Sequence, residues 1–358
     1  MRQRHGTARN HAGTSGEGPH DRRHPEVKEM ARKVNHRARG GRRKRRFWRP
    51  LIPIIRLEQN MKETSLRLTE PGEPPPLKQI ESWMGRVMPA VGRQERGIMK
   101  YPIYHVDAFT GRLFTGNPAA VVFSESELTP ETMQSIASEN NLSETAFAVP
   151  AGEAYRIRWF TPTVEVDLCG HATLAAAHVI FNHLSYSGST ISFSSKSGPL
   201  YVRKDREILY LSFPADSIQA VEPPQLLIDG LGVTPTETYK GRDDYLAIFD
   251  DENMILSLCP DMGLLSKVPA RGVIVTGPGH QVDFVSRFFA PQVGVSEDPV
   301  TGSAHTTLTP YWSKKLGKRH LQAKQISKQG GELVCQDLGK RIEIGGRAVT
   351  YLVGEISM

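Results

Sequence analysis

The sequence has few cysteines, and the three that it has lie far apart. Cys169, Cys259 and Cys335 form neither a C-x-x-C pair nor the even-numbered set of a disulfide framework. Their spacing predicts free thiols in a reducing compartment, and we expect a cytoplasmic protein. Long apolar runs are also missing. None approaches the ~18 residues that span a bilayer, so no membrane insertion is expected.

Metal motifs are lacking as well. No H-E-x-x-H pattern occurs, and no His and carboxylate triplet with ligand spacing is visible along the chain. His171 and His178 would lie about two helical turns apart, which is too far for joint ligation of one ion. We therefore expect no metal site and no cofactor.

Positive charge is concentrated at one end of the chain. Residues 1–56 hold 17 Lys and Arg against 4 Asp and Glu, whereas residues 99–358 hold 22 against 28. The basic character belongs to the N-terminal part, and residues 99–358 show no footprint for nucleic acid.

Residues 1–98 are rich in Arg, His, Gly and Pro without a lasting helical or strand period, which predicts a disordered basic extension. Its Arg42–Arg46 run is compatible with a nuclear localisation signal or a nucleic-acid-binding patch. Its Arg-rich composition is compatible with a transit peptide. The apolar run that follows is compatible with a membrane contact. We expect none of these roles. Met99 directly precedes the first convincing strand, so the extension is expected to be a solvated tail or sequence upstream of the true start.

The rest of the chain divides into two similar halves, predicted at 99–212 and 213–358. Each half begins with short strands that Gly, Pro and Asn interrupt, passes through one buried helix and ends in further strands. The first half also contains a helix predicted at 129–141, with Thr129 as N-cap and Pro130 in the first position. The helix at 169–183 is apolar nearly all round, which predicts a buried central helix. The helix at 302–317 ends at Gly317, a typical stop signal.

Both helices begin at a glycine among small residues, Gly170 in the first half and Gly302 in the second. A helix N-terminus offers unpaired N–H groups and about half a positive charge, so it attracts anions. Two such starts that face each other would hold a carboxylate and stabilise an enolate-like anion. Asp298, just upstream of the second start, would bond a substrate amine or hydroxyl.

Glu144 is the candidate for the proton transfer that such an anion requires. It lies between a helix end and an apolar strand, beside Leu142, Ala146 and Phe147. Low-dielectric surroundings raise a carboxyl pKa toward the working pH, which suits a general acid–base. An ordinary surface glutamate at a strand start is the alternative, which composition alone favours.

Five segments within residues 99–358 carry a family resemblance: "DAFTGRLFTGNPAAVV", "NLSETAF", "RWFTPTVEVDLCGHATLAAAHVIF", "FFAPQVGVSEDPVTGSAH" and "YWSKKLGK". In this order they resemble the phenazine biosynthesis-like (PhzF-type) isomerases, especially the animal phenazine biosynthesis-like domain proteins. The resemblance covers roughly residues 99–358 and leaves 1–98 outside.

The resemblance implies an α+β fold of the diaminopimelate-epimerase type, with two pseudo-symmetric lobes, each a β-rich barrel around a central helix, and a site between them. It also implies a homodimer and a cofactor-free isomerase that shifts a proton on an unsaturated amino or hydroxy carboxylate. In the bacterial archetype the substrate is a dihydro-hydroxyanthranilate. The residues that match the family's functional positions are Glu144 as acid–base, His171 and Asp298 as catalytic residues that position the substrate, and Asn117, Gly170, Gly302 and Ser303 as substrate-binding residues.

Two other functions compete with this one. The sister epimerases use two thiols, and Cys169 occupies the first thiol position, but the second is Thr301, whose hydroxyl is too weak an acid. We therefore expect Cys169 to be a small core residue. The other alternative is a non-enzymatic, homodimeric interaction or regulatory protein built on an isomerase fold. The sequence does not name the substrate.

Overall fold

The computed structural model describes residues 98–184 and 186–358, all of which belong to one compact unit. The predicted basic extension, apart from Ile98, lies outside the described residues. None of the helices within the described ranges is both long and apolar enough to cross a membrane.

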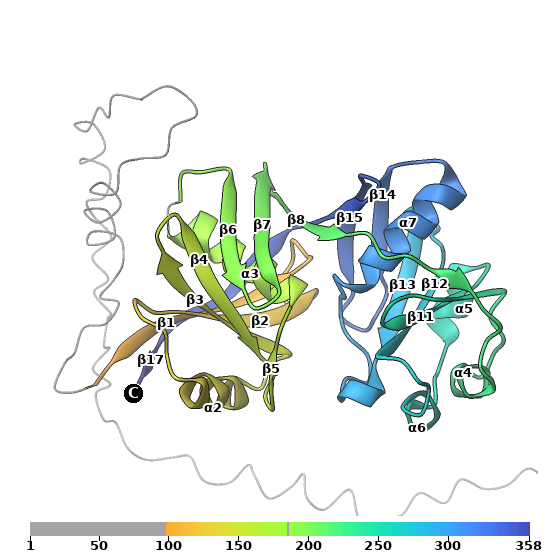
Figure 1. Ribbon diagram of the computed structural model, residues 1–358, viewed down its shortest axis with the longest axis horizontal. Coiled ribbons are helices and arrows are strands. Elements are labelled where there is room, and N and C mark those ends of the chain that lie inside the picture. Colours follow the sequence, from red (N-terminus) through yellow and green to blue (C-terminus); the bar gives the residue numbers. More distant parts are fainter. Residues whose placement is uncertain (1–97, 185) are drawn as a thin grey trace, which may run out of the picture. The chain divides into compact units, whose positions relative to one another are not determined.

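The elements follow the sequence order that Figure 1 shows in colour. The first part contains β1 (Lys100–Ala108), β2 (Asn117–Phe123), α2 (Pro130–Asn140), β3 (Glu144–Ala151), β4 (Ala154–Phe160), β5 (Glu165–Val166), α3 (Gly170–His183), β6 (Thr190–Ser195), β7 (Gly198–Asp205) and β8 (Ile208–Pro214). The second part contains β9 (Gln219–Ala220), α4 (Gln225–Leu231), β10 (Glu237–Lys240), β11 (Asp244–Ile248), α5 (Glu252–Ser257), α6 (Met262–Leu265), β12 (Gly272–Pro278), β13 (Phe284–Phe289), the 3-10 helix η2 (Pro291–Val293), α7 (Ala304–Leu316), β14 (His320–Gln325), β15 (Gly331–Asp337), β16 (Arg341–Gly346) and β17 (Ala348–Ser357).

The strand pairings repeat about the central antiparallel pair of β8 and β16. Outward on one side the order is β8, β7, β6, β4, β3, β2, β1 and β17. Outward on the other side it is β16, β15, β14, β13, β12, β11, β10 and β9. Both series run antiparallel, antiparallel, parallel, antiparallel, parallel, antiparallel, antiparallel. The predicted pseudo-symmetric α+β architecture is therefore confirmed.

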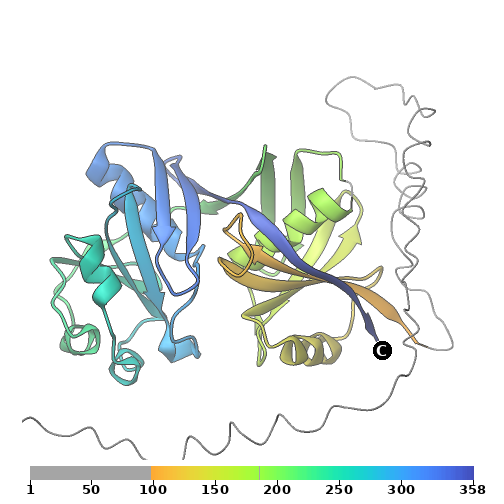
Figure 2. The same cartoon turned by 180° about the vertical axis from the view of Figure 1, so that it is seen from behind.

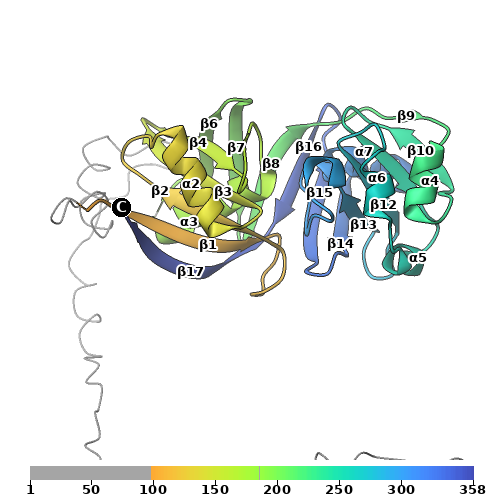
Figure 3. The same ribbon diagram turned by 90° about the horizontal axis from the view of Figure 1, so that it is seen from below.

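The last strand of the chain joins the other lobe. β9 pairs with β10 within the second lobe, whereas β17 follows β16 but pairs with β1 of the first lobe. Figures 2 and 3 show β17 lying alongside β1. The predicted second lobe, 213–358, thus includes a strand that completes the sheet of the first.

Each central helix lies in the crossover between two parallel strands, because parallel strands need a long connection. α3 connects β4 and β5 to β6 and is buried along nearly its whole length. α7 connects β13 to β14 and continues through Pro310. Because Pro310 has no N–H to donate, the carbonyl of Thr306 accepts a hydrogen bond from the Asp216 backbone N–H instead, at 3.1 Å.

Candidate active site

The starts of the two central helices meet. A Cβ built on Gly170 would lie 3.8 Å from the Cα of Gly302, and a Cβ built on Gly302 would lie 3.8 Å from the Cα of Gly170. The N-cap residues, Cys169 for α3 and Ser303 for α7, make no side-chain capping hydrogen bond. In α7 the N–H groups of His305 and Thr306 donate to the carbonyls of Gly302 and Ser303, so the N–H groups ahead of them, and those at the start of α3, are the ones that can hold an anion.

Two phenylalanine rings, those of Phe213 and Phe109, lie beside these glycines, and the sequence analysis identified neither. The ring tip of Phe213 would lie 3.7 Å from a Cβ on Gly170, and that of Phe109 would lie 3.9 Å from a Cβ on Gly302. Phe109 has a φ of 61°, an uncommon conformation for a bulky residue, directly beside the helix starts. No pattern in the sequence marks either phenylalanine, because their neighbours come from distant strands.

Glu144 and His171 form an ion pair beside the helix starts. Glu144 is the first residue of β3, His171 lies in the first turn of α3, and Glu144 Oε2 is 3.1 Å from His171 Nε2. The Glu144 side chain is 19% exposed and that of His171 only 7%. The sequence places these residues in different segments, and the fold brings them together.

The expected rise in the pKa of Glu144 is wrong. Burial is the largest single influence and raises this pKa, but the charge and polar contact of His171 and the contact with Cys169 together outweigh it and bring the pKa below its ordinary value. Burial also opposes a charged imidazole, yet the Cys169 sulfur and the Glu144 carboxylate hold the pKa of His171 well above its ordinary value. Since burial raises the pKa of the Cys169 thiol, the carboxylate is the charged partner. Glu144 therefore rests as a carboxylate beside an imidazolium.

This ion pair lacks the alignment of a hydrogen bond. Within the described part of the chain, Glu144 Oε2 and His171 Nε2 are both buried and have no hydrogen-bond partner. A buried polar atom without a partner costs about 1–3 kcal/mol. Both atoms can therefore gain from a ligand that supplies the missing bonds.

Asn117 connects the first lobe to the segment before α7. Its Nδ2 group donates to Asp298 Oδ1 at 2.8 Å and to the carbonyl of Val300 at 2.9 Å, which uses both of its protons. Its third neighbour, His171 Nδ1 at 3.3 Å, therefore receives no proton from Asn117. The Oδ1 atom of Asn117 is buried and lacks a partner among residues 98–184 and 186–358.

Asp298 is held by residues that the sequence analysis did not identify. Its carboxylate accepts a hydrogen bond from the hydroxyl of Thr301. Gln325, the last residue of β14, donates to the carbonyl of Asp298 at 2.8 Å and accepts from the Thr301 backbone N–H at 2.8 Å. Burial raises the pKa of Asp298, and the charge of His171 opposes the rise. Gln325 becomes recognisable only in three dimensions, since nothing in the sequence marks a strand-end glutamine.

Cys169 belongs to the hydrophobic core, but it also borders the site. Its side chain is buried, and its Sγ lies 3.5 Å from His171 Nδ1. The metal-ligating atoms of Glu144, Cys169 and His171 all lie within 4.8 Å of one another. The sequence shows no metal motif, and spacing along the chain does not report this cluster, because its members come from two separate elements.

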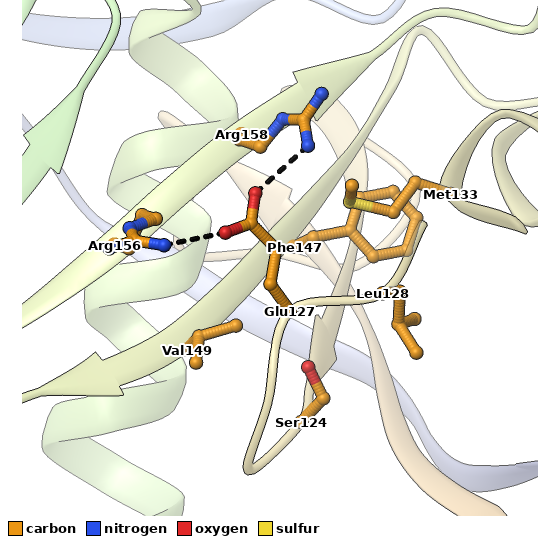
Figure 4. A pocket seen from close by; sticks show the side chains of 8 residues that line it. All are labelled: Ser124, Glu127, Leu128, Met133, Phe147, Val149, Arg156 and Arg158. Carbon is orange, nitrogen blue, oxygen red and sulfur yellow. Dashed lines mark hydrogen bonds and ion pairs between the residues drawn. The ribbon is translucent and has the colours of Figure 1, made fainter. Parts of the chain in front are cut away.

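A small pocket on the first lobe is lined by none of these residues, and Figure 4 shows its lining. There Glu127 bridges Arg156 at 2.6 Å and Arg158 at 2.9 Å. Arg158 also pairs with Glu165 at 2.8 Å, so the two arginines and the two glutamates compensate one another. This pocket offers no unpaired group for chemistry, so the Glu144 site remains the candidate.

Comparison with known proteins agrees with this site. The model of the phenazine biosynthesis-like protein family matches residues 106–354. An uncharacterized isomerase of Pseudomonas aeruginosa is 50% identical over 260 residues, which cover 73% of this chain and 100% of that protein. The mouse phenazine biosynthesis-like domain-containing protein 1 is 40% identical over 288 residues, which cover 72% and 100%. Contrary to expectation, the identity is higher to this bacterial relative than to the animal protein.

A crystal structure of an Enterococcus faecalis protein of the PhzF family superposes with a TM-score of 0.71 and 47% identity. The alignment covers 73% of this chain and 100% of that one. The epimerase-like α+β fold expected from the resemblance is thereby confirmed. The family model, the relatives and the matching fold together show that this chain belongs to the phenazine biosynthesis-like (PhzF) protein family.

Proposed function

We propose that the chain is a cofactor-free isomerase that shifts a proton between two carbons of an unsaturated amino or hydroxy carboxylate. One observation carries this proposal: the buried Glu144–His171 pair, 3.1 Å apart, lies beside two facing helix starts. The Glu144–His171 pair provides a base with a charged partner, and the helix starts provide hydrogen-bond donors for an anion. Several relatives carry the name isomerase, which supports the same reaction class.

In this proposal the substrate carboxylate lies between Gly170 and Gly302, where the N–H groups of both first turns and the Ser303 side chain surround it. Asp298 and the unpartnered Oδ1 of Asn117 accept hydrogen bonds from the substrate amine or hydroxyl. The edges of two phenylalanine rings beside the glycines suit a planar, unsaturated ring.

Glu144 then removes a proton from the carbon next to the unsaturated system and returns it to another carbon on the same face. Its pKa below the ordinary value keeps it ionised and ready to accept this proton. His171 remains an imidazolium and balances the charge while the proton resides on Glu144. The helix starts stabilise the anion where it develops, so the proton needs no second acid.

The test is turnover of a dihydro-hydroxyanthranilate in deuterated water. Glu144→Gln keeps the shape of the side chain but cannot accept a proton, so it should reduce turnover by about 10²–10⁴-fold. Deuterium should enter the product of the unmodified protein. Glu139→Gln, an exposed change at the end of α2, is the matched control and should retain full activity. Turnover of Glu144→Gln at the normal rate would show that Glu144 is structural.

The second candidate, an interaction or regulatory protein on this fold, gains support from β17. This strand pairs on one side with β1, and no described strand pairs with its other side. Tyr351, Leu352 and Val353 on it are exposed apolar residues, and the exposed Phe114 packs on Tyr351 with ring centroids 5.7 Å apart. We propose a homodimer through this surface, which is compatible with either function, and a cytoplasmic location, because all three cysteines are free.

A further inference from the structure

We propose that Glu144, Cys169 and His171 form a binding site for one thiophilic divalent cation, with zinc as the representative ion. Their ligand atoms all lie within 4.8 Å of one another. A thiolate, an imidazole and a carboxylate are the three ligand types that zinc takes in proteins. In the isomerase mechanism above the sulfur takes no part in the proton transfer itself, so the proposal gives Cys169 a further role.

The distances fit with little movement. Tetrahedral zinc, with bonds of about 2.0–2.3 Å, keeps its ligand atoms roughly 3.3–3.8 Å apart. Glu144 Oε2 and His171 Nε2 are already 3.1 Å apart, and Cys169 Sγ is 3.5 Å from the other ring nitrogen of His171. One ion cannot bind both ring nitrogens, so the Cys169 side chain must rotate from Nδ1 toward Nε2, starting from ligand atoms that already lie within 4.8 Å of one another.

A second, independent observation points to a ligand here. His171 is buried, and its Nε2 has no hydrogen-bond partner in the described part of the chain, as is also true of Glu144 Oε2. Buried polar atoms normally have partners, and exceptions often mark the place of an ion or ligand that the structure lacks. These two atoms are the ones that a metal ion would engage.

The charges would balance on binding. A zinc ion of charge +2 meets one carboxylate and one thiolate, with neutral imidazole as the third ligand, so the buried site carries no excess charge. The thiol and imidazolium protons leave to solvent as the metal enters. Three protein ligands leave the fourth position open, which is the arrangement of an accessible zinc site rather than a closed structural one.

A bound ion would inhibit the isomerase, because it would occupy the atoms of Glu144 that must accept the proton. This consequence rests on the proposed function, whereas metal binding itself does not. The site would thus make the enzyme sensitive to free zinc at the residue that performs the chemistry.

Titration of the full chain with cobalt(II) in place of zinc tests the site. A cobalt ion bound to a thiolate gives a sulfur-to-cobalt charge-transfer band. The five histidines of residues 1–97 cannot produce it, because that segment contains no cysteine. We expect the band to saturate at one cobalt per chain and zinc to displace it. Absence of the band in the unmodified protein would overturn the proposal.

Two serine variants locate the thiolate. Cys169→Ser should abolish the band, while Cys259→Ser, which alters the exposed cysteine, should leave it unchanged. Cys169 is the N-cap of α3 and makes no capping bond, and serine is a favoured N-cap, so Cys169→Ser should fold. A band that survives in Cys169→Ser, or disappears in Cys259→Ser, would contradict the assignment.

Glu144→Gln separates the metal site from the proposed function. It should lower zinc affinity at least tenfold, since loss of an outer-shell partner alone costs 10–100-fold in known sites. Unchanged zinc affinity would remove Glu144 from the ligand set and refute the site as proposed. If the cobalt results hold but Glu144→Gln turns over normally, the isomerase mechanism is at fault and the metal site stands.

Discussion

Substitution Gly302→Ala separates the role of the helix starts in binding from their role in folding. The new methyl group would lie 3.8 Å from the Cα of Gly170 and 3.9 Å from the ring tip of Phe109, both ordinary contact distances. Gly302 is not in the left-handed region, so alanine needs no backbone strain. Alanine at a compatible position stabilises by about 0.4–1 kcal/mol, so the melting temperature should not fall.

Binding should suffer nevertheless, because the methyl group fills the space proposed for the substrate carboxylate. The loss of one hydrogen bond to a charged group costs about 1.5–3 kcal/mol, which corresponds to about 10–100-fold in Kd. Calorimetry with 3-hydroxyanthranilate, a planar amino hydroxy carboxylate, measures this loss, and Gly170→Ala should behave alike from the opposite side. Unchanged affinity in both variants would refute the anion site.

A structural control comes from Gly331. A Cβ there would lie 2.4 Å from the Val300 side chain and 3.0 Å from the Phe109 carbonyl, so Gly331→Ala must displace its neighbours. This variant should lower the melting temperature, unlike Gly302→Ala. Equal destabilisation by both would show that Gly302 occupies a tightly packed position in the core and does not bind a ligand.

The remaining predictions concern pH, the basic extension and assembly. The pKa of Glu144 lies below its ordinary 4.5 and that of His171 well above its ordinary 6.5, so their pair stabilises the fold at intermediate pH. Glu144→Gln should therefore cost less stability as the pH falls below 4.5, and again in alkali where His171 loses its proton. Urea unfolding from about pH 3 to about pH 10 spans both ordinary pKa values by a unit or more. A constant difference in unfolding free energy between the two proteins over this range would contradict the pair. Residues 99–358 alone should melt at the temperature of the full chain, and a loss of several degrees would show that the extension packs on the fold. Light scattering should give twice the chain mass, and Val353→Lys on β17 should give a monomer; a single chain mass for the unmodified protein at all concentrations would refute the homodimer.

Local patterns predicted the local structure well. Thr129 and Pro130 mark the start of α2, and the structure shows Thr129 capping it. The apolar run at 169–183 became the buried α3, and the glycines that begin the two central helices do face each other. In each case the signal lies within one segment, where backbone conformation and burial are decided by neighbouring residues.

Long-range contacts account for what the sequence did not reveal. The apolar neighbours of Glu144 predicted a raised pKa, but His171 and Cys169, which lie 27 and 25 residues later in the chain, together reverse the direction. Gln325 could not be identified, because its amide acts on a loop that a whole helix separates from it. Such contacts between side chains of distant segments form only when the sheet is assembled, and the periodicity of apolar residues in the sequence does not predict them.

The placement of β17 in the sheet of the first lobe has a consequence for synthesis on the ribosome. β1 is the first described strand to emerge, yet its antiparallel neighbour β17 is translated after every other described strand. The nascent first lobe must therefore wait with one edge of β1 open while the whole second lobe is made. A chain that stalls before residue 348 would expose the unpaired edge of β1 to other nascent chains. Aggregation through this edge ends as a risk only when β17 is made and pairs with β1.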